Sequence, residues 1–201
     1  MEAKKGRREM KKFELTTKFI TNVAGKKLFR IKALVEFGNV KAGELGGYVE
    51  KEGNISQDGN AWVAGNACVD GNATVDGNAT VSGNAWVTGN TTVSGNATVT
   101  GNTKVSGNAT VSGNATVSGN AEVSGNTDYA LAQGFGTEFR CTTFYRGKNK
   151  KIMVNCGCFH GDLEEFRKQV KETRSGKIAK EYLMIADLME YHFASEDSDD
   201  E

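Results

Sequence analysis

The chain has 201 residues, 25 acidic and 25 basic side chains, 25 glycines and no proline. Its formal net charge of zero provides no field that would attract nucleic acid, and no apolar stretch approaches the roughly 20 residues of a membrane-spanning helix. Because the charged first residues lack the apolar core of a signal peptide, we expect a cytoplasmic protein that makes no membrane contact. Its four cysteines should then be reduced thiols.

Charge runs mark the two ends of the chain. Residues 1–11 form a basic arm, and residues 195–201 form an acidic tail. Short terminal charge runs are typically solvated and flexible, and this is the interpretation that we favour for both ends. Contact of the basic arm with phosphate groups is the alternative for the first of them.

Residues 12–48 are expected to form an N-terminal β cap. Apolar residues mark two extended stretches on either side of an Asn-Val-Ala-Gly sequence at 22–25, which predicts a β-hairpin. Val49 and Ile55 follow at the positions of two imperfect repeat units. A slip of two residues then precedes the regular repeat.

Residues 49–128 are dominated by a six-residue repeat whose commonest form is Val-Ser-Gly-Asn-Ala-Thr. Valine returns every six residues from Val63 to Val123, and Gly-Asn follows each valine two positions later. A fixed short period is typical of a solenoid. Strand side chains alternate between two faces, so each valine is expected to point inward and its Thr and Ser neighbours outward. Gly and Asn tolerate the left-handed backbone of a tight corner.

Three such units would close a triangular coil of 18 residues, with alanine inside each corner and asparagines stacked in ladders. This phrase resembles the repeat of the hexapeptide-repeat family, whose fold is the left-handed parallel β-helix. A disordered low-complexity tract is the alternative, but it would contain few β-branched residues, and here every unit has a valine. The rod would expose strand edges at both ends, so the flanking segments are expected to cap it.

Residues 129–194 are expected to form a ββαα domain that packs on the last coil. Two apolar, β-prone runs, 139–146 and 151–159, flank a Gly-Lys-Asn-Lys sequence and predict a hairpin. Asp162 has the position of a helix N-cap, with Glu165 at the capping-box spacing. The spacing of apolar residues predicts a helix that starts there and a second helix after it.

A possible metal site lies in this predicted hairpin. If the turn is centred on Lys148 and Asn149, Cys141 stands opposite Cys156. The candidate zinc ligands are Cys141, Cys156, Cys158 and His160. The same face is otherwise apolar, and free cysteine is among the most buried residue types, so we favour a packed core. Metal binding and a disulfide are the alternatives, and no cofactor is predicted.

The family resemblance does not carry an enzymatic activity onto these residues. Family members that transfer acyl groups use a histidine and usually a loop that protrudes from a coil. Members that hydrate carbon dioxide bind metal through three histidines. Here the two histidines, His160 and His192, lie outside the repeat, and no insertion interrupts residues 63–128. We therefore expect a non-enzymatic protein, with a hexapeptide-type acyltransferase as the alternative.

Sequence variation is concentrated on one predicted face of the rod. Every third unit shares a face, so two columns carry mostly threonine and the remaining column is variable. The partner-binding residues that we predict are Trp86, Lys104, Glu122, Asp70, Cys68 and Trp62. Tryptophan is enriched at interface hot spots, whereas drift at tolerant surface positions is the alternative. The threonine columns also resemble those of ice-binding solenoids, but their second outward position is mostly Ser or Asp.

Several phrases beyond the repeat resemble a group of uncharacterised phage and prophage proteins. These are K-F-E-L-T-T, L-F-R-I-K-A-L, F-G-N-V-K-A-G-E-L-G-G-Y-V-E, V-N-C-G-C-F, L-E-E-F and A-K-E-Y-L. The resemblance implies viral or prophage origin and a cap–solenoid–cap architecture, and it supplies no established activity.

On these grounds we expect a phage accessory protein that binds a host protein or protein complex in the host cytoplasm. Inhibition of a host defence or regulatory complex is the purpose that we favour. Members of the hexapeptide family commonly form trimers, so a homo-oligomer, dimer or trimer, is also expected. Binding of a nucleotide signal between subunits and a structural role in the virion are the alternatives.

Overall fold

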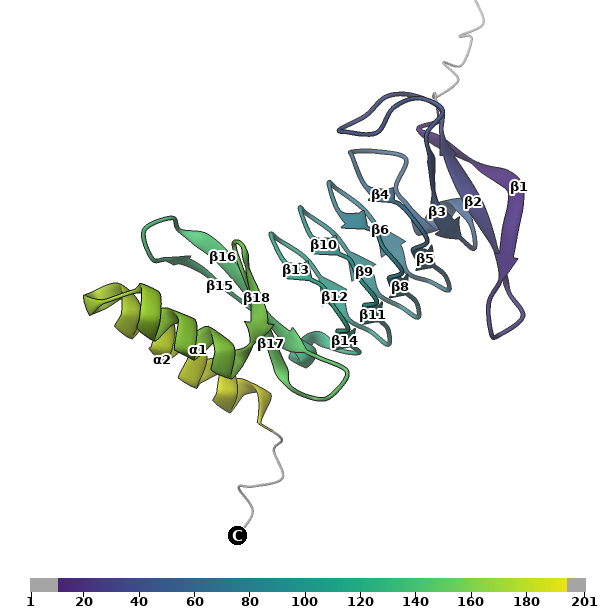
Figure 1. Ribbon diagram of the computed structural model, residues 1–201. Helices are drawn as coiled ribbons and strands as arrows, with labels where there is room; N and C mark the ends of the chain where they lie inside the picture. Colours follow the sequence, from purple (N-terminus) through teal and green to yellow (C-terminus); the bar gives the residue numbers. More distant parts are fainter. Residues whose placement is uncertain (1–10, 195–201) are drawn as a thin grey trace, which may run out of the picture.

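The computed structural model describes residues 11–194 as a mostly β protein built around a parallel β-solenoid (Figure 1). The N-terminal cap comprises β1 (Phe13–Thr21), β2 (Lys27–Ala33) and β3 (Leu45–Val49), followed by the short 3₁₀ helix Glu52–Asn54. The C-terminal domain follows a second 3₁₀ helix, Asn126–Asp128. It comprises β15 (Tyr129–Phe135), β16 (Arg140–Arg146), β17 (Ile152–Cys156), β18 (Phe159–Asp162), α1 (Leu163–Thr173) and α2 (Gly176–Phe193).

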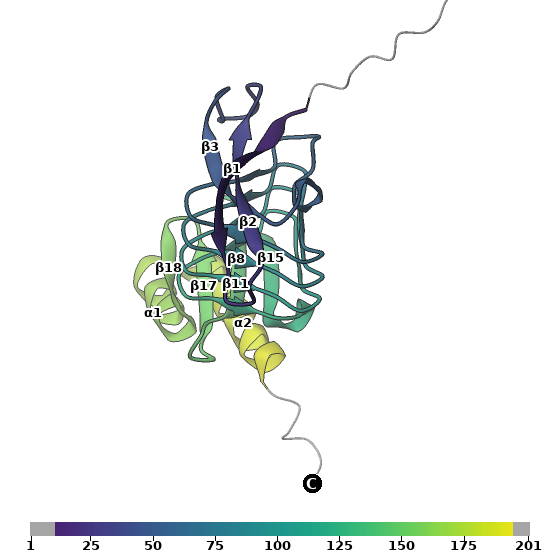
Figure 2. The same cartoon turned by 90° about the vertical axis from the view of Figure 1, so that its right-hand side faces the viewer.

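The solenoid consists of two-residue strands, each ending on a repeat valine. They are β4 (Trp62–Val63), β5 (Cys68–Val69), β6 (Thr74–Val75), β7 (Thr80–Val81), β8 (Trp86–Val87), β9 (Thr92–Val93), β10 (Thr98–Val99), β11 (Lys104–Val105), β12 (Thr110–Val111), β13 (Thr116–Val117) and β14 (Glu122–Val123). Each pairs in parallel with a strand one coil away, as in Val63 with Val81 and Val81 with Val99. This register confirms the predicted coil of three units. Figure 2 shows the coils as stacked loops.

The strands form three sheets along the rod. One has seven strands in the order β1-β2-β3-β5-β8-β11-β14, so the N-terminal cap continues one wall of the solenoid. The other walls are β13-β10-β7-β4 and β12-β9-β6. The repeat valines and the corner alanines are buried inside the three walls. Burial of each valine contributes roughly 1.5 kcal/mol or more, so the coils stabilise one another through a continuous column of aliphatic side chains.

Two kinds of hydrogen bond join successive coils. Backbone N–H groups donate to carbonyls of the next coil, as from Trp86 to Thr103 at 2.8 Å. At the corners, asparagine amides donate along ladders, from Asn78 to Asn96 at 3.0 Å and from Asn96 to Asn114 at 3.1 Å. The stacked asparagines that the sequence predicted are therefore confirmed.

The two imperfect units at the start of the rod are also confirmed. Val49 pairs with Val69, and Ile55 forms a bridge with Val75. The predicted hairpin turn lies between β1 and β2, where the Asn22 side-chain oxygen accepts hydrogen bonds from two backbone N–H groups at 3.0 and 2.9 Å. Because β2 pairs with β3 and β3 with β5, this hairpin becomes the edge of the seven-stranded sheet.

Lys12 caps the open N-terminal end of the solenoid. Its Nζ donates to the carbonyl oxygens of Asp58, Gly59 and Ala61 at 3.3, 3.4 and 3.0 Å, and it lies 4.9 Å from the centre of the Phe37 ring. Burial lowers the pKa of Lys12 to about 8, although the negative charge of Asp58 acts in the opposite direction. Lys12, the first residue of the predicted β cap, thus closes the strand end that the repeat leaves open.

The basic arm predicted for residues 1–11 is described only at its last residue. Lys11, assigned to the predicted arm, forms an ion pair with Glu52 at 2.8 Å. The rest of the arm, residues 1–10, and the predicted acidic tail, residues 195–201, lie outside the described residues. Within residues 11–194, neither helix combines the length and hydropathy that crossing a bilayer requires.

The C-terminal domain closes the other end of the rod. It contains the predicted hairpin and helices, with β15 and β18 as two further strands of an antiparallel sheet. Tyr145 joins the core of the solenoid, whereas Phe144 packs with the helices, so the sheet separates the two cores. The capping box is confirmed, because the Asp162 carboxylate accepts from the Glu165 N–H at 3.0 Å and the Glu165 carboxylate accepts from the Asp162 N–H at 2.8 Å.

Two corners of the solenoid carry a buried threonine in place of alanine and provide a matched pair. The Thr103 hydroxyl donates to the Thr100 carbonyl at 2.6 Å, whereas the Thr91 hydroxyl has no partner among the described residues. We expect Thr103→Ala to lower the free energy of unfolding by about 1 kcal/mol and Thr91→Ala to leave it unchanged or raise it. Urea denaturation measures both, and equal losses would contradict the assignment.

The buried amine of Lys12 predicts a pH dependence of stability. Its pKa is about 8 in the folded chain against a reference value of 10.5, so the unfolded chain holds the proton more tightly. The stability of the native chain, relative to Lys12→Met, should therefore rise between pH 8 and pH 10.5 and stay constant below pH 8. Urea denaturation at a series of pH values tests this, and a constant difference across the window would refute the burial of the charge.

Candidate functional site

The seven-stranded sheet presents one continuous line of outward side chains. Each of six residues is the direct Cα partner of the next one across neighbouring strands, and neighbouring strands lie about 4.8 Å apart. We call this line the row, and it consists, in order, of Arg30, Tyr48, Cys68, Trp86, Lys104 and Glu122. Such a line brings together residues far apart in sequence at near-equal steps.

Part of the row was predicted and part was missed. The predicted residues that the register brings together are Cys68, Trp86, Lys104 and Glu122. Tyr48 precedes Val49 as Trp86 precedes Val87, so the same repeat position could have identified it. Arg30 had no such signal, because it joins through the antiparallel pairing of β2 with β3. Its guanidinium lies over the Tyr48 ring at 5.0 Å and donates to the Tyr48 hydroxyl at 3.0 Å.

Trp62, one of the predicted partner-binding residues, is buried, which corrects the expectation that it would be exposed. It lies on β4, in a different wall from the row, and only 4% of its surface is exposed. Its ring packs edge-on against Phe37 and Phe13, with ring centres 5.4 and 6.4 Å apart. The N-terminal cap thus uses this large apolar ring as core, and Trp62 is not available to a partner.

Asp70 is also unavailable for direct partner contact, because it is 3% exposed. Its carboxylate accepts hydrogen bonds from Asn22 Nδ2 at 2.9 Å, from the Trp86 indole N–H at 3.3 Å and from the Thr88 hydroxyl. Asp70 therefore connects the hairpin turn to the solenoid and holds the Trp86 ring in one orientation. Asp70 thus acts in the site as a positioning residue for Trp86.

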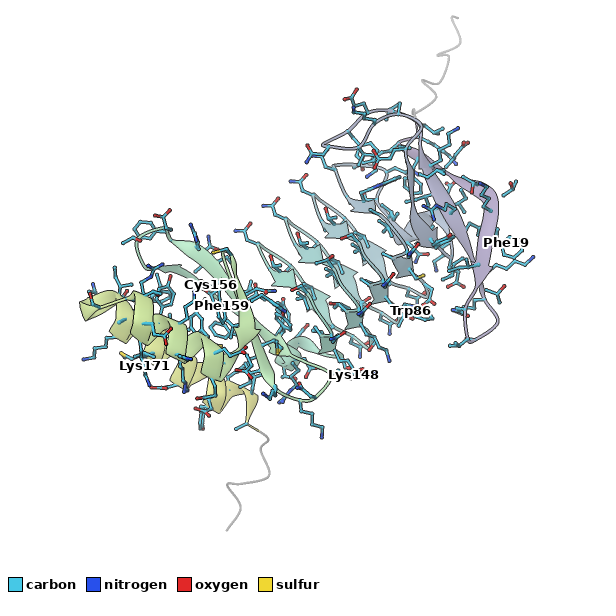
Figure 3. All side chains as sticks on the ribbon, in the orientation of Figure 1. Phe19, Trp86, Lys148, Cys156, Phe159 and Lys171 are labelled. Carbon is cyan, nitrogen blue, oxygen red and sulfur yellow. The ribbon has the colours of Figure 1, made fainter. Side chains whose placement is uncertain are left out.

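Trp86 is the half-buried aromatic centre of the row, and its label in Figure 3 lies on the outer side of the solenoid wall. Lys104 and Glu122 follow it and are exposed. Within residues 11–194, neither forms an ion pair within 4.0 Å. Burial, and secondarily the negative charge of Asp70, raise the pKa of the Cys68 thiol and so disfavour its thiolate form.

A shallow hollow lies beside the last three residues of the row. Row residues and a corner asparagine ladder line it, together with Lys148; the main lining residues are Trp86, Lys104, Glu122, Lys148, Asn84, Asn102 and Asn120. Lys148 belongs to the β16–β17 turn, and its backbone N–H donates to the Asn120 carbonyl at 2.9 Å. The C-terminal domain thereby adds an exposed cation to the surface of the solenoid, on the side where Figure 3 labels Lys148.

The predicted grouping of cysteines is wrong by one residue of register. Thr142, not Cys141, is the partner of Cys156. The cause is the turn, in which Lys150 adopts a left-handed conformation with φ 63°, so that three residues rather than two connect the strands. Since side chains alternate along a strand, Cys141 and Cys156 point to opposite faces of the sheet.

The alternative of a zinc site depended on Cys141 lying opposite Cys156, and the observed register does not place them so. Within residues 11–194, no group of three or more Cys, His, Asp or Glu side chains is placed to hold a metal ion. All four cysteines are free, so the disulfide alternative is not realised either. His160 instead contacts Asn155, with Nδ1 and Oδ1 2.7 Å apart, and Asn155 donates to the Thr116 carbonyl at 2.7 Å. These residues join the C-terminal domain to the last coil.

Comparison with known proteins supports the solenoid and leaves the site unassigned. The family model of the YdcK beta solenoid repeat matches residues 104–119 and 111–125, so these coils are similar to that repeat. No curated protein matches the chain. The matched stretch contains Lys104 and Glu122 of the row, and it gives the fold of the wall that carries them.

The positioning role of Asp70 predicts a difference from its neighbour Asp76. Both follow a valine in consecutive units, but the Asp76 side chain makes no hydrogen bond among the described residues. Asp70→Ala should lower the free energy of unfolding by about 1–3 kcal/mol because it leaves three partly buried donors without their acceptor, whereas Asp76→Ala should have little effect.

The same pair tests whether Asp70 holds the indole. In a Trp62→Phe background, where Trp86 is the remaining tryptophan, Asp70→Ala should increase acrylamide quenching of fluorescence. Asp76→Ala should leave quenching unchanged. Equal quenching of the two variants would show that the carboxylate does not restrain the ring.

Proposed function

We propose that this chain is a non-enzymatic binding protein that docks a protein partner through the row. The observation that carries the proposal is the register itself, which places one aromatic anchor and unpaired charges of both signs on a single wall. Apart from the buried Trp62, the other two walls present threonine at the same positions. A wall with distinct chemistry can discriminate between partners, and a uniform wall cannot.

Rigidity supports the proposal. Trp86 is held by a buried carboxylate and by the coils on either side, so little conformational freedom remains for a partner to remove. Pre-organisation of this kind lowers the entropic cost of association. Aromatic rings contribute disproportionately to interface energy, and exposed charges at the rim supply specificity and rate of association.

The finer parts of the proposal rest on sequence phrases alone. Their resemblance to phage and prophage proteins supports an accessory protein that acts on a host defence or regulatory complex. Four free thiols are in keeping with a reducing compartment such as the cytoplasm. An acyltransferase is less well supported, because residues 63–128 carry neither a histidine nor an inserted loop.

The role of the row predicts selective loss of partner capture. Trp86→Ala and Lys104→Glu should each reduce capture of a specific host protein from lysate by tenfold or more, since hot-spot truncation costs about 2 kcal/mol or more. Thr98→Glu, at the same repeat position on another wall, is the matched control and should capture as the native chain does. Quantitative mass spectrometry of the captured proteins measures this, with circular dichroism to verify folding.

Equal capture by all four chains would discard the row as the docking surface. Loss of capture in Thr98→Glu alone would move the surface to the wall of β4, β7, β10 and β13.

A further inference from the structure

The C-terminal end of the row has an order of charges that is complementary to itself. Along the rod, an aromatic ring, a cation and an anion follow one another on the row, and a second cation lies one strand further along, beside the asparagine ladder that borders the hollow. These are Trp86, Lys104, Glu122 and Lys148. When two copies of this surface face each other in opposite directions, a cation of one copy meets the aromatic ring of the other at each end, and opposite charges meet in the middle.

A second copy of the chain fits this order when the two rods run antiparallel. The two-fold axis would lie in the interface, perpendicular to the row, and pass between β11 and β14. Lys104 of one copy then faces Glu122 of the other, and the long side chain of Lys148 extends from beside the asparagine ladder toward Trp86 of the other copy, with every contact made twice. We propose that the partner at this end of the row is a second copy of this chain, bound through this isologous contact. The proposal rests on the proposed docking function of the row.

The chemistry favours this arrangement over the other symmetric choice. Parallel rods would bring Lys104 onto Lys104 and Glu122 onto Glu122, and like charges that face each other across an interface are strongly unfavourable. In the antiparallel pair, Lys148 would lie over an indole that Asp70 already orients, which is the geometry of a cation–π contact. The two threonine walls carry no charges at the corresponding positions and offer no such selection of direction.

The contact also uses a residue that the solenoid alone does not contain. Lys148 reaches the hollow because the β16–β17 turn bonds to the last coil through Asn120 and through the bridge between Ala121 and Gly147. The self-complementary order is therefore complete only when the C-terminal domain caps the rod. A solenoid without that cap would lack the cation–ring pair at each end of the contact.

Charge reversal in the full chain tests the direction of pairing. Sedimentation equilibrium should show the native chain as a dimer. Lys104→Glu alone and Glu122→Lys alone should each weaken the dimer by about tenfold or more, because both variants create two like-charged pairs. The double variant Lys104→Glu/Glu122→Lys should dimerise again, and so should an equimolar mixture of the two single variants. Only an antiparallel contact restores opposite charges in both cases.

Thr98→Glu is the matched control and should dimerise as the native chain does. A native chain that sediments as a monomer or a trimer would overturn the inference, as would single variants that remain dimeric or a mixture that fails to recover. These failures are separate from failure of the proposed function. If the native chain is monomeric but Lys104→Glu still loses capture of a host protein, the row docks another partner and only self-association is refuted.

Discussion

The hydrogen bonds between successive coils hold each outward side chain a fixed step from its neighbour in the next coil, and the buried valine column prevents the coils from sliding. An 18-residue period is what converts a repeat in sequence into columns in space, as in the pairing of Trp86 with Lys104. Because strand side chains alternate, a slip of one residue would turn every valine outward. The row exists only while this register is kept, so the stability of the rod and the pattern on its surface have the same origin.

Both ends of the rod are closed by segments that also shape the candidate site. At the N-terminal end, β2 and β3 extend the wall and add Arg30 and Tyr48 to the row, while the hairpin turn bonds to Asp70 behind Trp86. At the C-terminal end, the β16–β17 turn adds Lys148 to the hollow. Capping is needed because open strand edges invite uncontrolled pairing. Here each cap also contributes side chains, which makes the site a property of the whole chain.

The features that follow from the six-residue period could be predicted from the sequence. The valine positions were enough to place Cys68, Trp86, Lys104 and Glu122 on one wall. The burial of Trp62 depends on a cap that is distant in sequence and folds back over it, so an exposed position was a reasonable but wrong expectation. The pairing of Cys156 depends on the left-handed conformation of Lys150, which no residue type in that turn demands. The positions set by the repeat could therefore be predicted from the sequence, whereas the packing of distant segments and the conformation of the turn could not.

The central claim is that the coils form one rigid unit that holds the row in register. Amide hydrogen exchange on the full chain tests it most directly, because the N–H groups of Trp86 and Lys104 donate to the following coil. The account predicts that these amides exchange as slowly as those of Thr80 and Thr98 on a neighbouring wall, all through global unfolding. Rapid exchange at Trp86 and Lys104, with protection elsewhere, would show that the wall of the row opens locally and would contradict the account.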